Sequence, residues 1–302
     1  MQFDLLNKID YTYTTRKLEE MIAIPSVVRE EKELAHYLQN ELEALGLFTE
    51  LHEVESGRPN IYGKLKGDKP GKRLNFNGHL DTVPVVQGWD TDPYKAVKKE
   101  GKIYGLGSND MKGGIACALS MLKAFSDSDY PINGEITFAG VIDEEAYGEG
   151  AKAMLKTDWK NVNGIILGEP DTGEKDNPRA RPGETVESVI KDMENLVASL
   201  NLDARVEVKT KPPLYASYVL ERTHPFVELF DSTYRDIMGK ECYYEYSSSI
   251  SDANTYVGEG GIPCMHLGPS GGNTHQKNEY TILKSLIPVT KFYVEFARRF
   301  LS

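Results

Sequence analysis

The sequence predicts an α/β protein with a mostly parallel central sheet flanked by helices. Two observations predict this fold class. Helical and strand-like apolar patterns alternate along the chain, and the strand-like runs are short and bounded by polar turns. The chain has 302 residues, of which 40% are hydrophobic and 27% charged. This is an ordinary globular composition, and the length suffices for one large domain or two smaller ones.

The periodicity of apolar residues predicts the individual elements. In the first predicted helix, Leu34, Leu38 and Leu42 lie on one face, and Gly46 ends the pattern. The predicted helices cover residues 30–45, 112–125, 223–238 and 281–301. The predicted strands cover residues 48–54, 60–65, 73–78, 134–142, 163–168 and 262–267.

A change of composition falls at residues 170–182, where four prolines or glycines and many charged side chains predict a loop. A helix is predicted directly after it, with an apolar stripe of Val186, Val189, Ile190, Met193, Leu196, Val197 and Leu200. Alternation in 204–208 predicts a half-buried strand. One helix and one strand cannot bury a core alone, so this segment is expected to pack on the rest of the chain or on a second copy.

Charge and cysteine content restrict the class of protein. The net charge of −11, from 35 basic and 46 acidic residues, argues against a nucleic-acid binder, which needs a basic face. The first 20 residues carry early acids and lack the apolar core of a signal peptide, and no apolar run is long enough for a bilayer, so no membrane partner is expected. Three scattered cysteines without CxxC spacing favour a reducing compartment, and we expect a cytoplasmic protein.

The stretch "NFNGHLDTVP" (75–84) places His79 and Asp81 at the end of a predicted strand. Side chains two residues apart share a face of a strand, so Asp81 can orient His79. A histidine that binds metal through one nitrogen commonly donates its other N–H to a carboxylate. The alternative is a structural histidine beside a turn aspartate.

The glycine-rich stretch "GLGSNDMKGG" (105–114) presents Asp110 before a helix. It lacks the third glycine of a dinucleotide-binding loop, and Gly113 stands where a P-loop has serine or threonine. Asp110 is therefore either a carboxylate that bridges two metals or an ordinary helix cap.

Acids also end the next two predicted strands. The run "DEE" places Glu144 and Glu145 after the strand 134–142, and "GEP" places Glu169 after the strand 163–168. Adjacent like charges are costly unless a cation shares them, although a solvated acidic turn is the alternative. His275 lies in the late glycine-rich loop "GPSGGNTHQKNEY".

Five of these side chains, His79, Asp110, Glu145, Glu169 and His275, follow strand ends or lie in glycine-rich loops, where open α/β sheets bind ligands. Three carboxylates would cancel most of the charge of two divalent cations. Imidazole and oxygen ligands without thiolate suit zinc, with cobalt or manganese as alternatives.

The motifs "GHLDTVP", "GSNDMKGG", "DEE", "GEP" and "THQKNEY" occur in the order of a known family. The sequence resembles the acetylornithine deacetylase, succinyl-diaminopimelate desuccinylase and glutamate carboxypeptidase family of di-zinc hydrolases, whose fold is zinc-peptidase-like. The resemblance implies that His79 and Glu169 hold one metal and that Glu145 and His275 hold the other. It also implies that Asp110 bridges the metals and is followed by a cis peptide, that Asp81 orients His79, and that Glu144 is the general base.

The resemblance divides the chain into a catalytic metal-binding domain at 1–172 and 214–302 and a reduced α+β lid remnant at 173–213. Relatives insert here a lid that supports dimerisation and supplies a histidine, whereas this chain has no histidine between Glu169 and Pro212. A homodimer through 183–211 is expected from the exposed stripe. Backbone amides at Gly271, Gly272 and Asn273 are candidates for binding a substrate carboxylate.

Two other functions compete with this hypothesis. "GPSGG" (268–272) matches the G-x-S-x-G pattern of serine hydrolases, but no aspartate follows Ser270 and His275 comes too soon. The second alternative is a metal-binding domain that is catalytically weak or inactive without its lid. The favoured prediction is a metal-dependent hydrolase (a deacylase or exopeptidase) that cleaves an amide bond of a small N-acyl amino acid or peptide.

Overall fold

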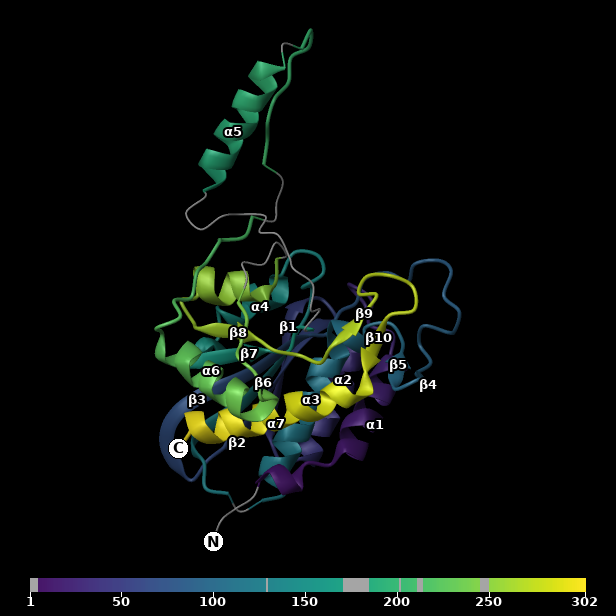
Figure 1. The fold of residues 1–302 in the computed structure, drawn as a ribbon, viewed down its shortest axis with the longest axis vertical. Coiled ribbons are helices and arrows are strands. Elements are labelled where there is room, and N and C mark those ends of the chain that lie inside the picture. Colours follow the sequence, from purple (N-terminus) through teal and green to yellow (C-terminus); the bar gives the residue numbers. More distant parts are fainter. Residues whose placement is uncertain (1–4, 129, 171–184, 201, 211–213, 245–249) are drawn as a thin grey trace.

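The computed structural model describes residues 5–128, 130–170, 185–200, 202–210, 214–244 and 250–302. They form a layered α/β body, from which one helix, α5, stands apart (Figure 1). Within these residues, no helix combines the length and the apolar character that crossing a membrane requires.

The predicted helices and strands of the body are confirmed, with ends shifted by a few residues. The helices are α1 (Tyr11–Ile22), α2 (Lys32–Ala44), α3 (Gly113–Ser126), α4 (Glu149–Met154), α5 (Val186–Ser199), α6 (Pro225–Met238) and α7 (Leu283–Phe300). The larger strands are β1 (Phe48–Glu55), β2 (Arg58–Lys66), β3 (Lys69–His79), β6 (Asn133–Val141), β7 (Gly164–Leu167) and β8 (Cys264–His266). Helices α1 and α4 were not predicted.

The main sheet has six strands in the order β1-β2-β6-β3-β7-β8. Strand β6 pairs in parallel with β3, β3 with β7, and β7 with β8, while β1, β2 and β6 pair antiparallel. The prediction of a mostly parallel central sheet is therefore confirmed, with an antiparallel edge. The parallel half of the sheet carries the candidate site, because its three central strands end at the same edge.

Successive side chains of a strand point to opposite faces of the sheet, so each strand contributes to two cores. Phe76 and Phe138 face the larger core, which α1, α2, α3, α6 and α7 cover. Ala139, Val141 and Tyr62 face a smaller core, which α4 and residues 253–264 cover. Each of these side chains is at most 1% exposed, so the sheet is buried on both faces, as expected of a central sheet in an α/β protein.

A second, four-stranded antiparallel sheet was not predicted. Its order is β4 (Val97–Lys99), β5 (Lys102–Tyr104), β10 (Tyr280–Ile282) and β9 (Gly271–Gly272). Strand β10 lies between β5 and β9, with Thr281 opposite Ile103 and Gly271. This small sheet therefore fixes the late loop 268–280 against the segment that leads into α3.

The segment after residue 184 differs in part from the prediction. The helix is confirmed as α5, and Thr185 caps it by accepting the Ser188 amide. The strand predicted at 204–208 is wrong: these residues pair with no strand, because the described part of the chain places no strand edge beside them. The apolar stripe is not packed on the body, and Met193 and Leu196 are 47% and 52% exposed.

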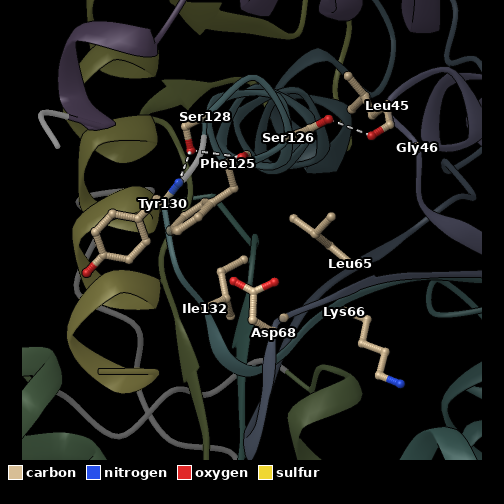
Figure 2. Close-up of a pocket in the computed structure, with 11 residues that line it drawn as sticks. Leu45, Gly46, Leu65, Lys66, Asp68, Phe125, Ser126, Ser128, Tyr130 and Ile132 are labelled. Atoms are coloured by element: carbon tan, nitrogen blue, oxygen red, sulfur yellow. Dashed lines mark hydrogen bonds between the residues drawn. The ribbon is translucent and has the colours of Figure 1, made fainter.

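A cavity of about 410 Å³ opens beside Leu45, Leu65, Phe125 and Ile132 (Figure 2). It lies at the end of the sheet where Leu65 pairs with Ile136, near the start of β6. The candidate metal ligands follow the other end of β6, so this cavity is not their binding site.

Candidate metal centre

Strand register brings the candidate ligands to one edge of the sheet. His79, the last residue of β3, lies opposite Val141 at the end of β6, and Asn77 lies opposite Leu167 at the end of β7. Glu144, Glu145 and Glu169 directly follow β6 and β7. Because parallel strands end together, residues far apart in sequence meet there.

Asp110 lies between the two histidines. Its Oδ1 is 2.9 Å from Nε2 of His79, and its Oδ2 is 3.1 Å from Nε2 of His275. Each carboxylate oxygen thus faces a different imidazole, which is the arrangement of a bridging ligand. The sequence-based prediction that these three residues converge agrees with this geometry.

The two glutamates complete the two halves of the site. Glu145 Oε1 is 2.8 Å from Nε2 of His275, and Glu169 Oε1 is 3.8 Å from Nε2 of His79. Glu169 Oε1 is buried and has no hydrogen-bond partner among the described residues. A buried, unpaired carboxylate oxygen is costly, and a cation beside it would remove that cost.

Burial and neighbouring charges shift the pKa values of several side chains in this cluster. Burial raises the pKa of Glu169 well above its ordinary value, and the charge of Asp110 adds to the increase. Burial likewise raises the pKa of Glu144 well above its ordinary value. Hydrogen bonds to Asp110 and Glu145 raise the pKa of His275 to about 10. Burial would lower the pKa of His79, but Asp110 and Glu169 raise it.

These features together fit a site for divalent cations. The ligand atoms of His79, Asp110 and Glu145 lie within 4.8 Å of one another. The donors are imidazole nitrogens and carboxylate oxygens, a set that suits zinc and related ions. The pKa values of Glu169 and Glu144 stay raised although two histidines lie nearby, so the imidazoles do not offset all of the carboxylate charge.

The contact between Asp81 and His79 differs from the expected one, in which the Asp81 carboxylate would accept the N–H of His79. Nδ1 of His79 is 2.9 Å from the backbone oxygen of Asp81 and 3.7 Å from its carboxylate. The carboxylate instead accepts the backbone amides of Glu144 and Glu145, at 3.2 and 2.9 Å. Asp81 therefore contacts His79 through its main chain and holds the acidic turn through its side chain.

Arg58, which no sequence motif marked, also supports this turn. Its guanidinium contacts Glu31 at 2.5 Å, Glu55 at 2.7 Å and Asp143 at 2.8 Å. Asp143 has a positive φ of 72°, which is unusual for a residue with a side chain. The buried ion pair holds this turn in place directly before Glu144.

Glu279 was also missed, although it lies in the late motif. Its carboxylate accepts the backbone amides of Gly107, Asn109 and Asp110, at 2.7, 2.8 and 2.9 Å. The side chain is buried, because Glu279 is 2% exposed. Its partners are backbone amides about 170 positions away in sequence, so no local side-chain pattern marks this role.

Close backbone contact brings the start of α3 to the end of β7. A Cβ atom on Gly114 would lie 2.0 Å from the carbonyl oxygen of Gly168, so only glycine fits at this position. The contact holds the Asp110 segment beside Glu169. The expected cis peptide between Asp110 and Met111 is present.

The late loop leaves the serine hydrolase alternative without support. His275 contacts Asp110 and Glu145, while the main chain of Ser270 bonds to the hydroxyl of Ser285. The substrate-binding candidates Gly271 and Gly272 form β9, which pairs with β10. Asn273 donates its side-chain amide to the backbone oxygen of Asn278.

Two other histidines, His224 and His266, have partners of their own. His224 accepts the Phe226 amide and caps α6. Nε2 of His266 is 3.2 Å from the Ser251 hydroxyl. Asp252, which follows Ser251 and which no sequence motif marked, is 2% exposed, and its Oδ2 has no hydrogen-bond partner among the described residues. Burial raises the pKa of Asp252 to about 7.

The chain is similar to known hydrolases. The model of the peptidase family M20/M25/M40 matches residues 75–299. A succinyl-diaminopimelate desuccinylase of Orientia tsutsugamushi (strain Ikeda) is 30% identical over 227 residues, which are 71% of this chain and 54% of that enzyme. The chain thus spans about half the length of the curated relatives that it matches.

Two solved structures share the fold. A tripeptidase of Staphylococcus aureus superposes with a TM-score of 0.80 at 17% identity, covering 97% of this chain and 99% of that one. A dinuclear metal-binding peptidase of Bacillus subtilis superposes with a TM-score of 0.72 at 15% identity, covering 96% and 98%.

Proposed function

Because the chain belongs to the peptidase family M20/M25/M40, we propose that it is a metal-dependent hydrolase of an amide bond in an N-acyl amino acid or small peptide. The observation that carries the proposal is the position of Asp110, whose two oxygens lie 2.9 and 3.1 Å from two different histidines. One carboxylate shared between two imidazoles supports a pair of cations rather than one.

In this proposal His79 and Glu169 hold one ion, Glu145 and His275 hold the other, and Asp110 bridges them. Zinc is the proposed metal, with cobalt or manganese as alternatives, because the ligands are nitrogen and oxygen without thiolate. When bound, two such ions would polarise the substrate carbonyl and lower the pKa of water at the site.

The residues of this chain would then position the reaction and move the proton. Burial raises the pKa of Glu144 well above its ordinary value, which suits a group that accepts a proton and later releases it to the leaving amine. Asp81 fixes Glu144 through the backbone amide that its carboxylate accepts at 3.2 Å. Gly271, Gly272 and Asn273 are proposed to bind a free carboxylate of the substrate.

The domain division and the partners remain part of the proposal. We assign 1–172 and 214–302 to the catalytic domain and 173–213 to a lid remnant, which the separation of α5 from the body supports (Figure 1). The exposed stripe on α5 supports a homodimer through 183–211. The buried thiols of Cys117 and Cys264 support a reducing compartment, so we propose the cytoplasm.

A second candidate function is a metal-binding domain with weak or absent turnover. The observation that favours it is the sequence between Glu169 and Pro212, which contains no histidine, whereas the family resemblance implies one in the lid. Loss of one oxyanion donor typically lowers a rate by about 10²–10³. Weak hydrolysis would therefore persist if the remaining machinery is intact.

The test is metal analysis together with a substrate panel. We expect two ions per chain after loading with Zn²⁺ or Co²⁺, and turnover of at least one N-succinyl, N-acetyl or N-formyl amino acid, dipeptide or tripeptide. Glu144→Gln should keep both ions and lose about 10²–10⁴ in rate. Glu149→Gln on α4, an acid paired with Lys152 and 40% exposed in its side chain, is the matched control and should keep its rate.

Two results separate the candidates. No turnover on any substrate with two bound ions would favour the binding domain. Failure to bind a second ion would contradict the proposed site itself.

A further inference from the structure

Glu279 makes an unusual set of contacts for a side chain that is not itself a proposed metal ligand. One oxygen, Oε1, accepts the amides of Asn109 and Asp110 at 2.8 and 2.9 Å. The other, Oε2, accepts the amide of Gly107 at 2.7 Å. Glu279 is 2% exposed, so these contacts are shielded from water. Burial strengthens these hydrogen bonds, because the low dielectric of the interior increases their electrostatic attraction. Burial also raises the pKa of Glu279 to about 8.

These hydrogen bonds join the two segments that meet at the candidate metal centre. The amides come from the turn that carries Asp110, and Glu279 ends the loop that carries His275. Further hydrogen bonds join the same segments: Thr281 Oγ1 donates to the Ser108 carbonyl at 2.6 Å, and Asn109 donates to Thr274 Oγ1 at 3.2 Å. The bonds of Thr281 and Thr274 end at Ser108 and Asn109, whereas Glu279 also binds the main-chain amide of Asp110 itself.

We propose that Glu279 is a positioning residue of the metal centre, which fixes Asp110 relative to His275 and so sets the affinity for the ion that these two residues would share. This inference rests on the proposed function, because it assumes that Asp110 and His275 are ligands. In the structure, Nε2 of His275 and Oδ2 of Asp110 are 3.1 Å apart. A shift of the Asp110 main chain would change that separation directly.

Glutamine at this position would test the role of the carboxylate with little change of size. An amide group has one oxygen, so its NH₂ group must face amides that are themselves donors. Either the Gly107 amide or the amides of Asn109 and Asp110 would then lose their acceptor. A buried amide without an acceptor favours movement of the turn that carries Asp110.

The experiment measures metal binding rather than turnover. Zn²⁺ and Co²⁺ affinities of the wild type and of Glu279→Gln are determined by competition with a chromophoric chelator, and the absorption spectrum of bound Co²⁺ reports ligand geometry. We expect the variant to bind one of the two ions about 10–100-fold less tightly, which is the usual effect of changing a partner of a metal ligand. We also expect a changed cobalt spectrum.

Glu295→Gln is the matched control. Glu295 on α7 also accepts several charge-assisted bonds, from Arg298 and Arg299, but it lies away from the centre. Its loss should leave both affinities within about twofold of wild type. Thermal unfolding in the presence of chelator checks that each variant is folded.

Glu279→Asp provides a second route if Glu279→Gln does not fold. Aspartate keeps the carboxyl group, but its side chain is shorter by one methylene. We therefore expect a metal affinity between those of the wild type and the glutamine variant. A folded Glu279→Gln or Glu279→Asp that binds both ions with wild-type affinity would overturn the inference. A wild-type chain that binds fewer than two ions would instead contradict the proposed function, so the two failures are distinguishable.

Discussion

Arg58 and Asp143 form a buried ion pair, with Nη2 2.8 Å from Oδ1. The same guanidinium contacts Glu31, and Glu31 and Asp143 are 0% and 2% exposed. Arg58→Met would leave two buried carboxylates without a cation. We expect the free energy of unfolding to fall by about 3–5 kcal/mol, measured by urea denaturation, because removing one partner of a buried pair leaves an uncompensated charge.

The control for that prediction is Arg298→Met on α7. Arg298 pairs with Glu295 at 2.7 Å, and its side chain is 37% exposed. Glu295 keeps Arg299 as a second partner at 2.6 Å, and a partly exposed pair contributes about 1 kcal/mol or less, so this variant should be nearly neutral. Equal losses in the two variants would show that the Arg58 cluster is not a special element of the fold.

Glu169→Gln should stabilise the fold in the absence of metal but weaken the binding of metal. The pKa of Glu169 is raised, so its contribution to stability is present below its ordinary pKa of 4.5 and is lost as pH rises through the folded-state pKa. At pH 8 in chelator the neutral glutamine should therefore raise the free energy of unfolding. With zinc, the same variant should lose more affinity than the about 10–100-fold typical of an outer partner. If Glu169→Gln were less stable than the wild type in chelator, the Glu169 carboxylate would have a stabilising partner, and this prediction would be wrong.

We expect the difference in stability between the wild type and Asp252→Asn to depend on pH. Burial raises its pKa from 3.8 to about 7, so its contribution to stability is present below 3.8 and lost as pH rises through about 7. Asp252→Asn stays neutral throughout. In chelator, the stability advantage of the variant should grow by roughly 2–3 kcal/mol between pH 5 and pH 8, measured by urea denaturation. An advantage independent of pH would exclude this assignment.

The apolar stripe of α5 predicts self-association. Met193 and Leu196 are 47% and 52% exposed, and large exposed apolar patches commonly mark interfaces. Sedimentation equilibrium of the wild type should show dimers, and a Met193→Glu, Leu196→Glu double variant should be monomeric. Lys191→Glu, which changes charge on the same helix away from the stripe, should still dimerise. A monomeric wild type at high concentration would contradict the proposed partner.

The central sheet could be predicted because apolar residues recur in its strands with a period that is visible locally. Strand β6 and strand β3 each match a predicted run to within a few residues at the end that leads to the site. The small second sheet could not be predicted in this way. Its strands have two or three residues, and Thr281 pairs with Ile103, which is distant in sequence. Such short strands form only because tertiary contacts supply the partner.

The candidate ligands could be predicted for a related reason. His79, Glu145 and Glu169 each follow a recognisable strand, and parallel strands place such residues together. Arg58 and Glu279 could not, because their partners are distant in sequence, and those of Glu279 are backbone amides that no side-chain pattern marks. The strand predicted at 204–208 failed because alternation of side chains does not by itself provide a neighbouring strand.

The proposed ligands are spread along the chain from His79 to His275, with α5 between Glu169 and the last of them. A nascent polypeptide emerging from the ribosome would therefore present isolated imidazoles and acids long before a complete binding site exists. Loading with metal would be one of the last events in maturation, after β10 has docked beside β5. Metal content would then report on completed folding as well as on ion supply.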